Sequence, residues 1–409
     1  MIKYIKYFTI LVIPLLLVGC NKEKPLKGTR EAIEGITYNG MDINPSNNVI
    51  INANSSSKLN NKLQILWKRS IGKKPIISNI VTDNNNIYTM DSNGSLYCIN
   101  KNTGNTVYKQ FITSPPYFSA LYGAISINNG IIYIGTNTNE VIVFNTKNKK
   151  ILWKKKFNNS IKGAPVCFKD KIIVNTINNC TYALNRNNGE IIWNYSLGED
   201  NLTMLSSSSP VLYNNSVLLA YSSGDIVSLN LNNGEVNWSE LLIPNYVYNS
   251  GSGLLQPVVS PIVIGDKVLI SNVNSMMVLL DANVGIKIWE KRIGTATDPV
   301  IVNNQWIFVI ADNNVLCINI NNGNIQWKLD LKNMFNKNKL YKDCFWYGPL
   351  LVNNQLWIFC SNANILKLNL SNGKVIERQY IHHVMHDNTP VIDNNKMFTQ
   401  VRGNIYALQ

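Results

Sequence analysis

The chain has 409 residues, with 38 Lys and Arg against 24 Asp and Glu, which gives a formal charge of +14. At 45% hydrophobic and 15% charged residues it is too apolar for a disordered protein. His382, His383 and His386 are its three histidines, so a histidine-dependent catalytic triad or zinc site could form only around that stretch. Asparagine far outnumbers the acidic residues, and Ile, Val, Tyr and Trp are frequent. This composition favours short strands joined by tight turns, so the chain is predicted to be all-β.

The first segment has the pattern of a signal peptide. Lys3 and Lys6 precede an apolar run over residues 8–18, which is too short for a membrane span. Leu17-Val18-Gly19-Cys20 follows and resembles the lipobox of bacterial lipoproteins. The resemblance implies removal of residues 1–19 and lipidation of Cys20, and Asn21 after it implies the periplasmic face of the outer membrane. An ordinary signal peptide with an incidental Cys20 is the alternative.

The next segment is predicted to be a flexible tether. Residues 20–62 are polar and rich in Asn and Ser, with no sustained hydrophobic periodicity. Several acyl chains on Cys20 would anchor this segment firmly in a bilayer.

From residue 63 onward a single pattern recurs. Asn or Asp is followed four residues later by Gly, or once by Lys149, and eight residues later by an aromatic residue, or once by Glu377. Gly supplies the positive φ of a tight turn, Asn bonds to its own backbone there, and the aromatic residue lies in the next strand. Two further short strands precede each copy, so the unit has four antiparallel strands. The copies span Asn100–Tyr108, Asn145–Trp153, Asn185–Trp193, Asn230–Trp238, Asp281–Trp289, Asn319–Trp327 and Asn369–Glu377.

The spacing of the units predicts a closed ring. The outer-strand positions, with Trp67 as the first, recur at intervals typical of propeller blades. Trp67 lacks three preceding strands, whereas the chain end has three strands without a fourth. Pairing residues 63–70 with residues 404–409 completes an eight-bladed β-propeller of four-stranded antiparallel blades over residues 63–409 and removes open sheet edges. A tandem of β-sandwiches leaves both end segments unexplained.

The outer-strand signature resembles the pyrroloquinoline-quinone-type propeller repeat. Together with the lipobox and the length, the repeat makes the chain most similar to the BamB family, the lipoproteins of the outer-membrane β-barrel assembly machinery. The resemblance implies a non-enzymatic scaffold without cofactor or metal and with a monomeric propeller. Its implied partners are the central barrel-inserting subunit and nascent outer-membrane proteins, and no nucleic acid. The alternatives are a pyrroloquinoline-quinone-dependent dehydrogenase and a propeller that binds a cell-envelope polymer.

The resemblance also implies where partners bind. The family's Leu-x-Leu-Arg loop before a blade-opening proline matches Leu202, Met204 and Leu205, with Leu205 in place of the arginine. The family's Asp-x-Asp pair falls at Gln256 and Val258, so a charged contact is lost.

Long connections add apolar side chains that are expected on the same face as that loop. Residues 243–259 bring Tyr246, Tyr248, Leu254 and Leu255, and residues 331–348 bring Phe345, Trp346 and Tyr347. Exposed aromatic residues suit a protein interface. The alternative for residues 331–348 is that they plug the central channel.

Other chemistry-bearing residues have structural interpretations that we favour. One tryptophan per unit indicates packing between blades more than a quinone site. The three histidines are expected in a solvated loop rather than a metal site, because Asp387 is the one acidic residue beside them. Lys154-Lys155-Lys156 fits a guarded sheet edge or attraction to anionic surfaces. The six cysteines other than Cys20 show no disulfide framework.

Overall fold

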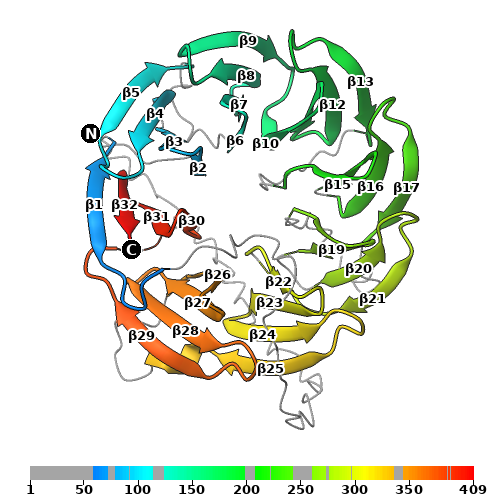
Figure 1. Ribbon diagram of the computed structural model, residues 1–409. Coiled ribbons are helices and arrows are strands. Elements are labelled where there is room, and N and C mark those ends of the chain that lie inside the picture. The colour runs from blue at the N-terminus through cyan, green and yellow to red at the C-terminus, as the bar shows by residue number, and fades with distance from the viewer. Residues whose placement is uncertain are drawn as a thin grey trace, which may run out of the picture. The chain divides into compact units, whose positions relative to one another are not determined.

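The computed structural model describes residues 59–71, 79–91, 93–113, 124–198, 208–221, 223–242, 260–272, 276–295, 297–335, 344–384, 386 and 388–409. All of them belong to one compact unit, residues 39–409. Eight four-stranded antiparallel sheets follow one another around a ring (Figure 1), as predicted for an eight-bladed β-propeller. Each blade runs from an innermost to an outermost strand.

The first four blades each follow the chain without interruption. Blade 1 consists of β2 (Val81–Thr82), β3 (Asn86–Met90), β4 (Ser95–Asn100) and β5 (Thr106–Phe111). Blade 2 consists of β6 (Ala124–Asn128), β7 (Ile131–Gly135), β8 (Glu140–Asn145) and β9 (Lys150–Lys156). Blade 3 consists of β10 (Ile161–Phe168), β11 (Lys171–Thr176), β12 (Cys180–Asn185) and β13 (Ile191–Ser196). Blade 4 consists of β14 (Val211–Tyr213), β15 (Ser216–Ala220), β16 (Asp225–Asn230) and β17 (Val236–Leu241).

The next three blades repeat this order, and the eighth combines both ends of the described chain. Blade 5 consists of β18 (Ile262–Ile264), β19 (Lys267–Ser271), β20 (Met277–Asp281) and β21 (Lys287–Lys291). Blade 6 consists of β22 (Val300–Val302), β23 (Trp306–Ala311), β24 (Asn314–Asn319) and β25 (Ile325–Asp330). Blade 7 consists of β26 (Trp346–Val352), β27 (Gln355–Cys360), β28 (Asn364–Asn369) and β29 (Val375–Tyr380). Blade 8 consists of β30 (Val391–Asp393), β31 (Lys396–Val401), β32 (Asn404–Leu408) and β1 (Ile65–Ser70).

The predicted closure of the ring is confirmed. Strand β1 pairs antiparallel with β32 in a register that opposes Trp67 to Ala407 and Ser70 to Asn404. Figure 1 shows the two strands side by side although they come from opposite ends of the colour scale. Gln64 and Gln409 exchange backbone hydrogen bonds of 2.9 and 3.0 Å beyond the ladder.

The burial of the strands follows their position in the blade. The two middle strands, such as β4, are almost entirely buried, whereas outer strands such as β5 alternate toward solvent. The turn between β26 and β27 contains Asn353 and Asn354 at φ 50° and 59°, which is the left-handed backbone of a two-residue hairpin that Asn tolerates.

The core is divided among the contacts between consecutive blades. One cluster, for example, joins Phe308 of blade 6 to Ile358 of blade 7, and another joins Trp357 of blade 7 to Met397 of blade 8. Trp346 and Tyr347 lie in strand β26, with Trp346 only 9% exposed, so their assignment to a long connection was wrong. Phe345, just before the strand, is 70% exposed as expected.

A short 3-10 helix, Lys332–Phe335, follows β25. Among the residues that the structure describes, no helix has the length and hydrophobicity that a membrane crossing requires.

Candidate functional site

The residues predicted to bind partners lie outside the described ranges, and so does Cys20. They are Leu202, Met204, Leu205, Tyr246, Tyr248, Leu254, Leu255 and Gln256. The residues that flank them are described and are firmly held. Ser208 is 1% exposed and Leu242 is 8% exposed, and Ser260 Oγ accepts a 2.9 Å hydrogen bond from the backbone of Ser209. The first connection therefore ends at a fixed point, and the second starts and ends at fixed points of neighbouring blades.

The repeated tryptophans fasten each blade to the next. Six junctions between blades contain a repeat tryptophan, and in each the indole Nε1 donates a hydrogen bond to a backbone carbonyl of the next blade. The acceptor is the residue directly after the third strand of that blade. For Trp238 the acceptor is Ala282 at 3.1 Å, and for Trp327 it is Leu370 at 2.8 Å. The other four pairs are Trp67 with Lys101, Trp153 with Arg186, Trp193 with Leu231 and Trp289 with Ile320. This geometry supports the interpretation that the tryptophans pack between blades.

Each of these six tryptophans also covers a glycine of the next blade. A Cβ added to Gly285 would lie 2.5 Å from Trp238 Cε3, and one added to Gly373 would lie 2.4 Å from Trp327 Cε3. The glycines have positive φ as well, 75° and 67° in these two cases. Glycine is thus needed both for the turn and for the close approach of the indole ring.

Two junctions depart from this arrangement. Between blades 1 and 2, Tyr108 takes the place of tryptophan, and Lys149 takes the place of glycine with its Nζ 5.2 Å from the tyrosine ring centroid. Between blades 7 and 8, Glu377 takes the place of tryptophan and accepts a 3.0 Å hydrogen bond from Lys367. Blade 8 has no turn between its third and fourth strands, because β32 and β1 are not consecutive in the chain. Lys367 is 1% exposed and also donates to the carbonyl of Asn61, so the segment before β1 takes the place of this turn.

Hydrogen bonds also link the innermost parts of consecutive blades. Ala164 N donates to Ser209 Oγ at 3.0 Å, and Gly348 N donates to Thr389 Oγ1 at 3.1 Å. Asn79 and Ile125 form a reciprocal pair of 2.9 and 3.0 Å between blades 1 and 2. The ring is therefore fastened at both its inner and its outer circumference.

The three histidines do not share one environment. His382 and His383 are exposed, as expected for a solvated loop. His386 is fully buried, with Nδ1 3.3 Å from Thr399 Oγ1 and its ring packed edge-on against Phe359. Burial lowers the pKa of His386 to about 3. The expectation of a solvated loop was wrong for this residue, because it fills the junction between blades 7 and 8.

The cysteines of the described part are all free thiols. Cys98, Cys317 and Cys360 are buried, and burial raises the pKa of Cys98 to about 11 and that of Cys360 to about 12. Such thiols remain protonated and unreactive at neutral pH.

Lys162 is a buried lysine on the innermost strand β10. Burial lowers its pKa to about 8. A shift that burial alone produces is weak evidence for catalysis.

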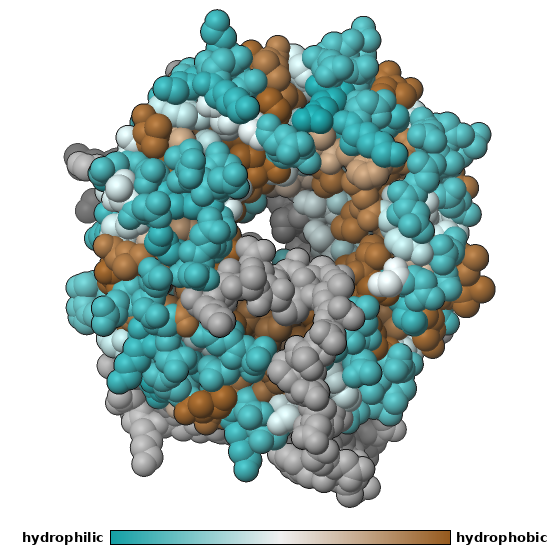
Figure 2. All heavy atoms as spheres, in the orientation of Figure 1, coloured by the Kyte–Doolittle hydropathy of each residue, from teal (hydrophilic) through white to brown (hydrophobic). Residues whose placement is uncertain are grey.

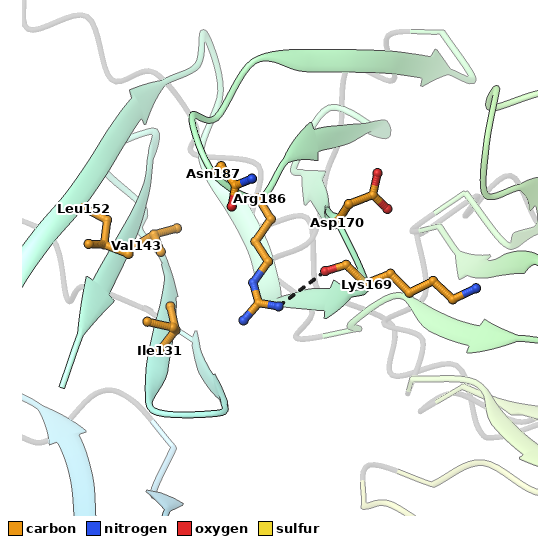
Figure 3. Close-up of a pocket in the computed structure, with 7 residues that line it drawn as sticks. All are labelled: Ile131, Val143, Leu152, Lys169, Asp170, Arg186 and Asn187. Atoms are coloured by element: carbon orange, nitrogen blue, oxygen red, sulfur yellow. Dashed lines mark hydrogen bonds between the residues drawn. The ribbon is translucent and has the colours of Figure 1, made fainter. Parts of the chain in front are cut away.

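An open pocket of about 550 Å³ lies between the edges of blades 2 and 3. Ile131, Val143 and Leu152 form its apolar side, and the other lining residues are Lys169, Asp170, Arg186 and Asn187. Figure 3 shows the Arg186 side chain extended between the apolar side chains and the backbone of Lys169. Sequence reasoning missed this site. Its signal is Arg186 itself, because four of the equivalent positions, Leu231, Ala282, Ile320 and Leu370, are apolar.

Exposed apolar side chains are distributed around the outer strands. They include Val107 and Phe111 on β5, Ile286 before β21, and Ile376 on β29. Figure 2 shows apolar areas separated by polar ones around the ring on the visible face.

Comparison with known proteins identifies the family. The family model described as "Outer membrane protein assembly factor BamB" matches residues 93–329, which is more than half of the chain. The chain belongs to the BamB family. An outer membrane protein assembly factor BamB from Yersinia pestis is 18% identical over 247 residues, which cover 59% of this chain and 63% of that relative. The match thus spans less than two thirds of the BamB relative.

Solved structures agree on the fold of this BamB-family chain. BamB from Moraxella catarrhalis superimposes with a TM-score of 0.68 at 15% identity, covering 85% of this chain and 99% of that one. A quinohemoprotein alcohol dehydrogenase from Comamonas testosteroni gives a TM-score of 0.62 at 12% identity, covering 85% and 76%. At these identities the likeness concerns the propeller architecture.

The dehydrogenase neighbour raises the question of whether this chain could hold a quinone. The six interblade tryptophans cannot stack on a ligand in the channel, because their indoles lie on glycines of the next blade and their Nε1 atoms bond to its carbonyls. Within the described ranges, no group of three His, Cys, Asp or Glu side chains is placed to hold a metal ion. The six interblade tryptophans are therefore not available to stack on a quinone.

Proposed function

We propose that this protein is a non-enzymatic periplasmic scaffold lipoprotein of the outer-membrane β-barrel assembly machinery. The observation that carries the proposal is the match of the BamB family over residues 93–329. In this proposal residues 1–19 are a signal peptide, Cys20 carries the lipid, residues 20–62 are a tether, and residues 63–409 form the propeller. The lipid anchor holds the protein on the periplasmic face of the outer membrane.

The fastening of the ring supports a scaffold role. Hydrogen bonds and ring contacts lock consecutive blades together at the outer strands, and further bonds lock the innermost strands. A rigid ring that displays irregular connections at fixed points is a suitable platform for binding other proteins.

The proposed partners are the central barrel-inserting subunit and nascent outer-membrane proteins. Leu202, Met204 and Leu205 would contact the subunit, with Tyr246, Tyr248, Leu254, Leu255 and Gln256 from the next connection. Because the family's arginine and Asp-x-Asp pair are replaced, the contact is expected to be mainly hydrophobic and weakly dependent on salt.

The proposal is tested by capture from the native membrane. The tagged full-length protein is purified from detergent-solubilised outer membrane, and the proteins that copurify are identified by mass spectrometry. We expect a large barrel protein with periplasmic domains. The double variant Leu202→Asp/Met204→Asp should lose it at unchanged melting temperature, whereas Asn303→Asp/Asn304→Asp at a short turn should keep it. Recovery with the loop variant and loss with the turn variant would contradict the proposed binding face.

Two further measurements test the lipid anchor and the non-enzymatic assignment. Cys20→Ser should abolish palmitate labelling and release a folded protein, because the propeller does not depend on acyl chains. The purified protein is also supplied with pyrroloquinoline quinone and calcium and assayed for oxidation of alcohols and sugars. Oxidation that is lost when the quinone is withheld would overturn the non-enzymatic assignment.

A further inference from the structure

The pocket between blades 2 and 3 has an apolar wall that faces a guanidinium group. Ile131, Val143 and Leu152 come from three strands of blade 2, and Arg186 follows the third strand of blade 3. Leu152 is 49% exposed, whereas Val143 is 1% exposed, so the wall leads from the surface into the contact between the blades. A volume of about 550 Å³ lies within the range of small-molecule sites.

Arg186 is held in place at both its main chain and its side chain. Its backbone N–H donates to Asp170 O at 2.8 Å, and its carbonyl accepts the 2.9 Å hydrogen bond of Trp153 Nε1. Its Nη1 donates to Lys169 O at 3.3 Å, and its guanidinium carbon lies 6.0 Å from the ring centroid of Tyr133. A guanidinium fixed in this way is preorganised to bind a ligand.

The charge of Arg186 is not balanced by a carboxylate in the described part of the chain. The acidic residue that lines the pocket, Asp170, forms its ion pair with Lys171 at 3.2 Å, and this hydrogen bond lowers the pKa of Asp170. Figure 3 shows the side chains of Asp170 and Lys169 directed away from the apolar wall. Since the bond to Lys169 uses one of the five guanidinium N–H groups, others remain for an anion.

The surroundings of the pocket favour anions. Six lysines lie between Lys147 and Lys156, on and just before strand β9, which supplies Leu152 to the wall. Two of them, Lys149 and Lys154, are directed to blade 1, where they contact the Tyr108 ring and the carbonyl of Ile112, and the other four remain. The acidic residue opposite this strand is Glu140, in register with Lys156. Such a concentration of positive charge raises the local concentration of anionic ligands.

We propose that this pocket binds a carboxylate attached to a branched aliphatic group. The carboxylate is bound by the free N–H groups of Arg186, and the aliphatic group packs against Leu152 and Ile131, with the buried Val143 at the closed end of the pocket. Guanidinium groups match carboxylates in geometry and charge, and the apolar wall rejects a fully hydrated anion such as sulfate. Two sources present this chemistry: a small free acid, and the C-terminal residue of a polypeptide with an aliphatic side chain. The site is independent of the proposed scaffold function.

Titrations of the full-length protein test the proposal. With ¹³C-labelled methyl groups of Ile, Leu and Val, NMR follows Ile131, Val143 and Leu152 as 4-methylpentanoate or N-acetyl-Ala-Ala-Leu is added. Both acids should shift these methyl signals, whereas 4-methylpentanamide and the C-terminally amidated peptide should not at equal concentration. Tighter binding of the peptide acid than of 4-methylpentanoate would assign the site to chain termini, and equal affinity would assign it to small acids.

Substitutions locate the binding. Arg186→Gln should weaken binding of the acids about tenfold or more, because a charge-assisted hydrogen bond is lost. Leu152→Ser should weaken binding of the acids severalfold, and because Leu152 is exposed the substitution should not disturb folding. Lys374→Gln, which removes an exposed positive charge in blade 7, should leave binding unchanged. The proposal is overturned if neither acid shifts the three methyl signals at 20 mM, if the amides bind as well as the acids, or if Arg186→Gln binds like the wild type.

Discussion

Leu63 and Gln379 are 316 residues apart and exchange two hydrogen bonds. Leu63 N donates to Oε1 of Gln379 at 3.1 Å, and Nε2 of Gln379 donates to Leu63 O at 2.7 Å. Leu63 is 4% exposed and belongs to the core cluster between blades 7 and 8. The segment before β1 is thus attached to blade 7 before its chain enters blade 8.

The first prediction concerns this attachment. Gln379→Ala should lower the free energy of unfolding by about 1–3 kcal/mol, because two backbone groups of Leu63 lose their partner. Gln110 occupies the equivalent position of β5. Its Nε2 donates one long, exposed hydrogen bond of 3.4 Å to Phe111 O, the residue next to it in the chain. Gln110→Ala is therefore a matched control and should change stability by less than about 0.5 kcal/mol. Equal losses in urea denaturation of the two variants would show that the attachment does not contribute to closure.

The second prediction concerns the glycines beneath the tryptophans. Gly285→Ala should destabilise the ring through its positive φ of 75° and through a Cβ 2.5 Å from Trp238. Gly265 has φ 60° with nothing within 4 Å of an added Cβ, so Gly265→Ala measures the backbone cost alone, about 1–2 kcal/mol. We expect Gly285→Ala to cost about 1–3 kcal/mol more than this control, as an overpacked contact does. Similar melting temperatures for the two variants would argue against a tight fit of the indole.

The third prediction concerns the departure between blades 1 and 2. Tyr108→Trp alone should destabilise the protein, since Lys149 carries a Cβ where the six tryptophan junctions have glycine. Adding Lys149→Gly should reverse the loss, because the indole ring then fits and its Nε1 gains the Thr146 carbonyl as acceptor. A double-mutant cycle should give a favourable coupling of about 1–2 kcal/mol. Additive effects would mean that the pairing of Tyr108 with Lys149 is incidental.

The fourth prediction concerns acid stability. Burial lowers the folded-state pKa of His386 to about 3, from its ordinary value of 6.5. The folded state therefore favours the neutral ring, so its contribution is fully present above pH 6.5 and is lost as the pH falls toward 3. Between pH 7.5 and 5.0 the wild type should lose about 2 kcal/mol of unfolding free energy that His386→Gln does not lose. Parallel pH profiles in urea denaturation would contradict a buried neutral histidine.

The spacing of a few residue types was enough to predict the ring. Asn or Asp, Gly four residues later and Trp eight residues later mark a hairpin and an interblade contact at once, because the same glycine forms the turn and receives the indole. Lys149 and Glu377 depart from this pattern. At these two junctions a lysine–tyrosine contact and a Lys367–Glu377 hydrogen bond replace the packing of tryptophan on glycine. Trp67 without preceding strands predicted the pairing of β1 with β32 for a topological reason that does not depend on side-chain detail.

What could not be predicted depends on side-chain contacts between neighbouring blades. His386 lies in an irregular connection with no periodicity, so nothing in its neighbours signals that Phe359 and Thr399 enclose it. Trp346 and Tyr347 follow a polar stretch and were assigned to a connection, although they begin the innermost strand of blade 7. Arg186 differs from the apolar residues at four equivalent positions, but only the approach of blade 2 places Ile131 and Leu152 opposite it.

The pairing of β1 with β32 also orders events during folding. Ser70 and Asn404, which lie opposite each other in this ladder, are separated in the sequence by the seven other blades. Each of those seven blades forms from one continuous stretch of chain, whereas the eighth needs two distant stretches to meet. The blade that closes the ring is therefore the last to fold, and until then the chain exposes a strand that a peptide with the sequence of β32 should be able to capture.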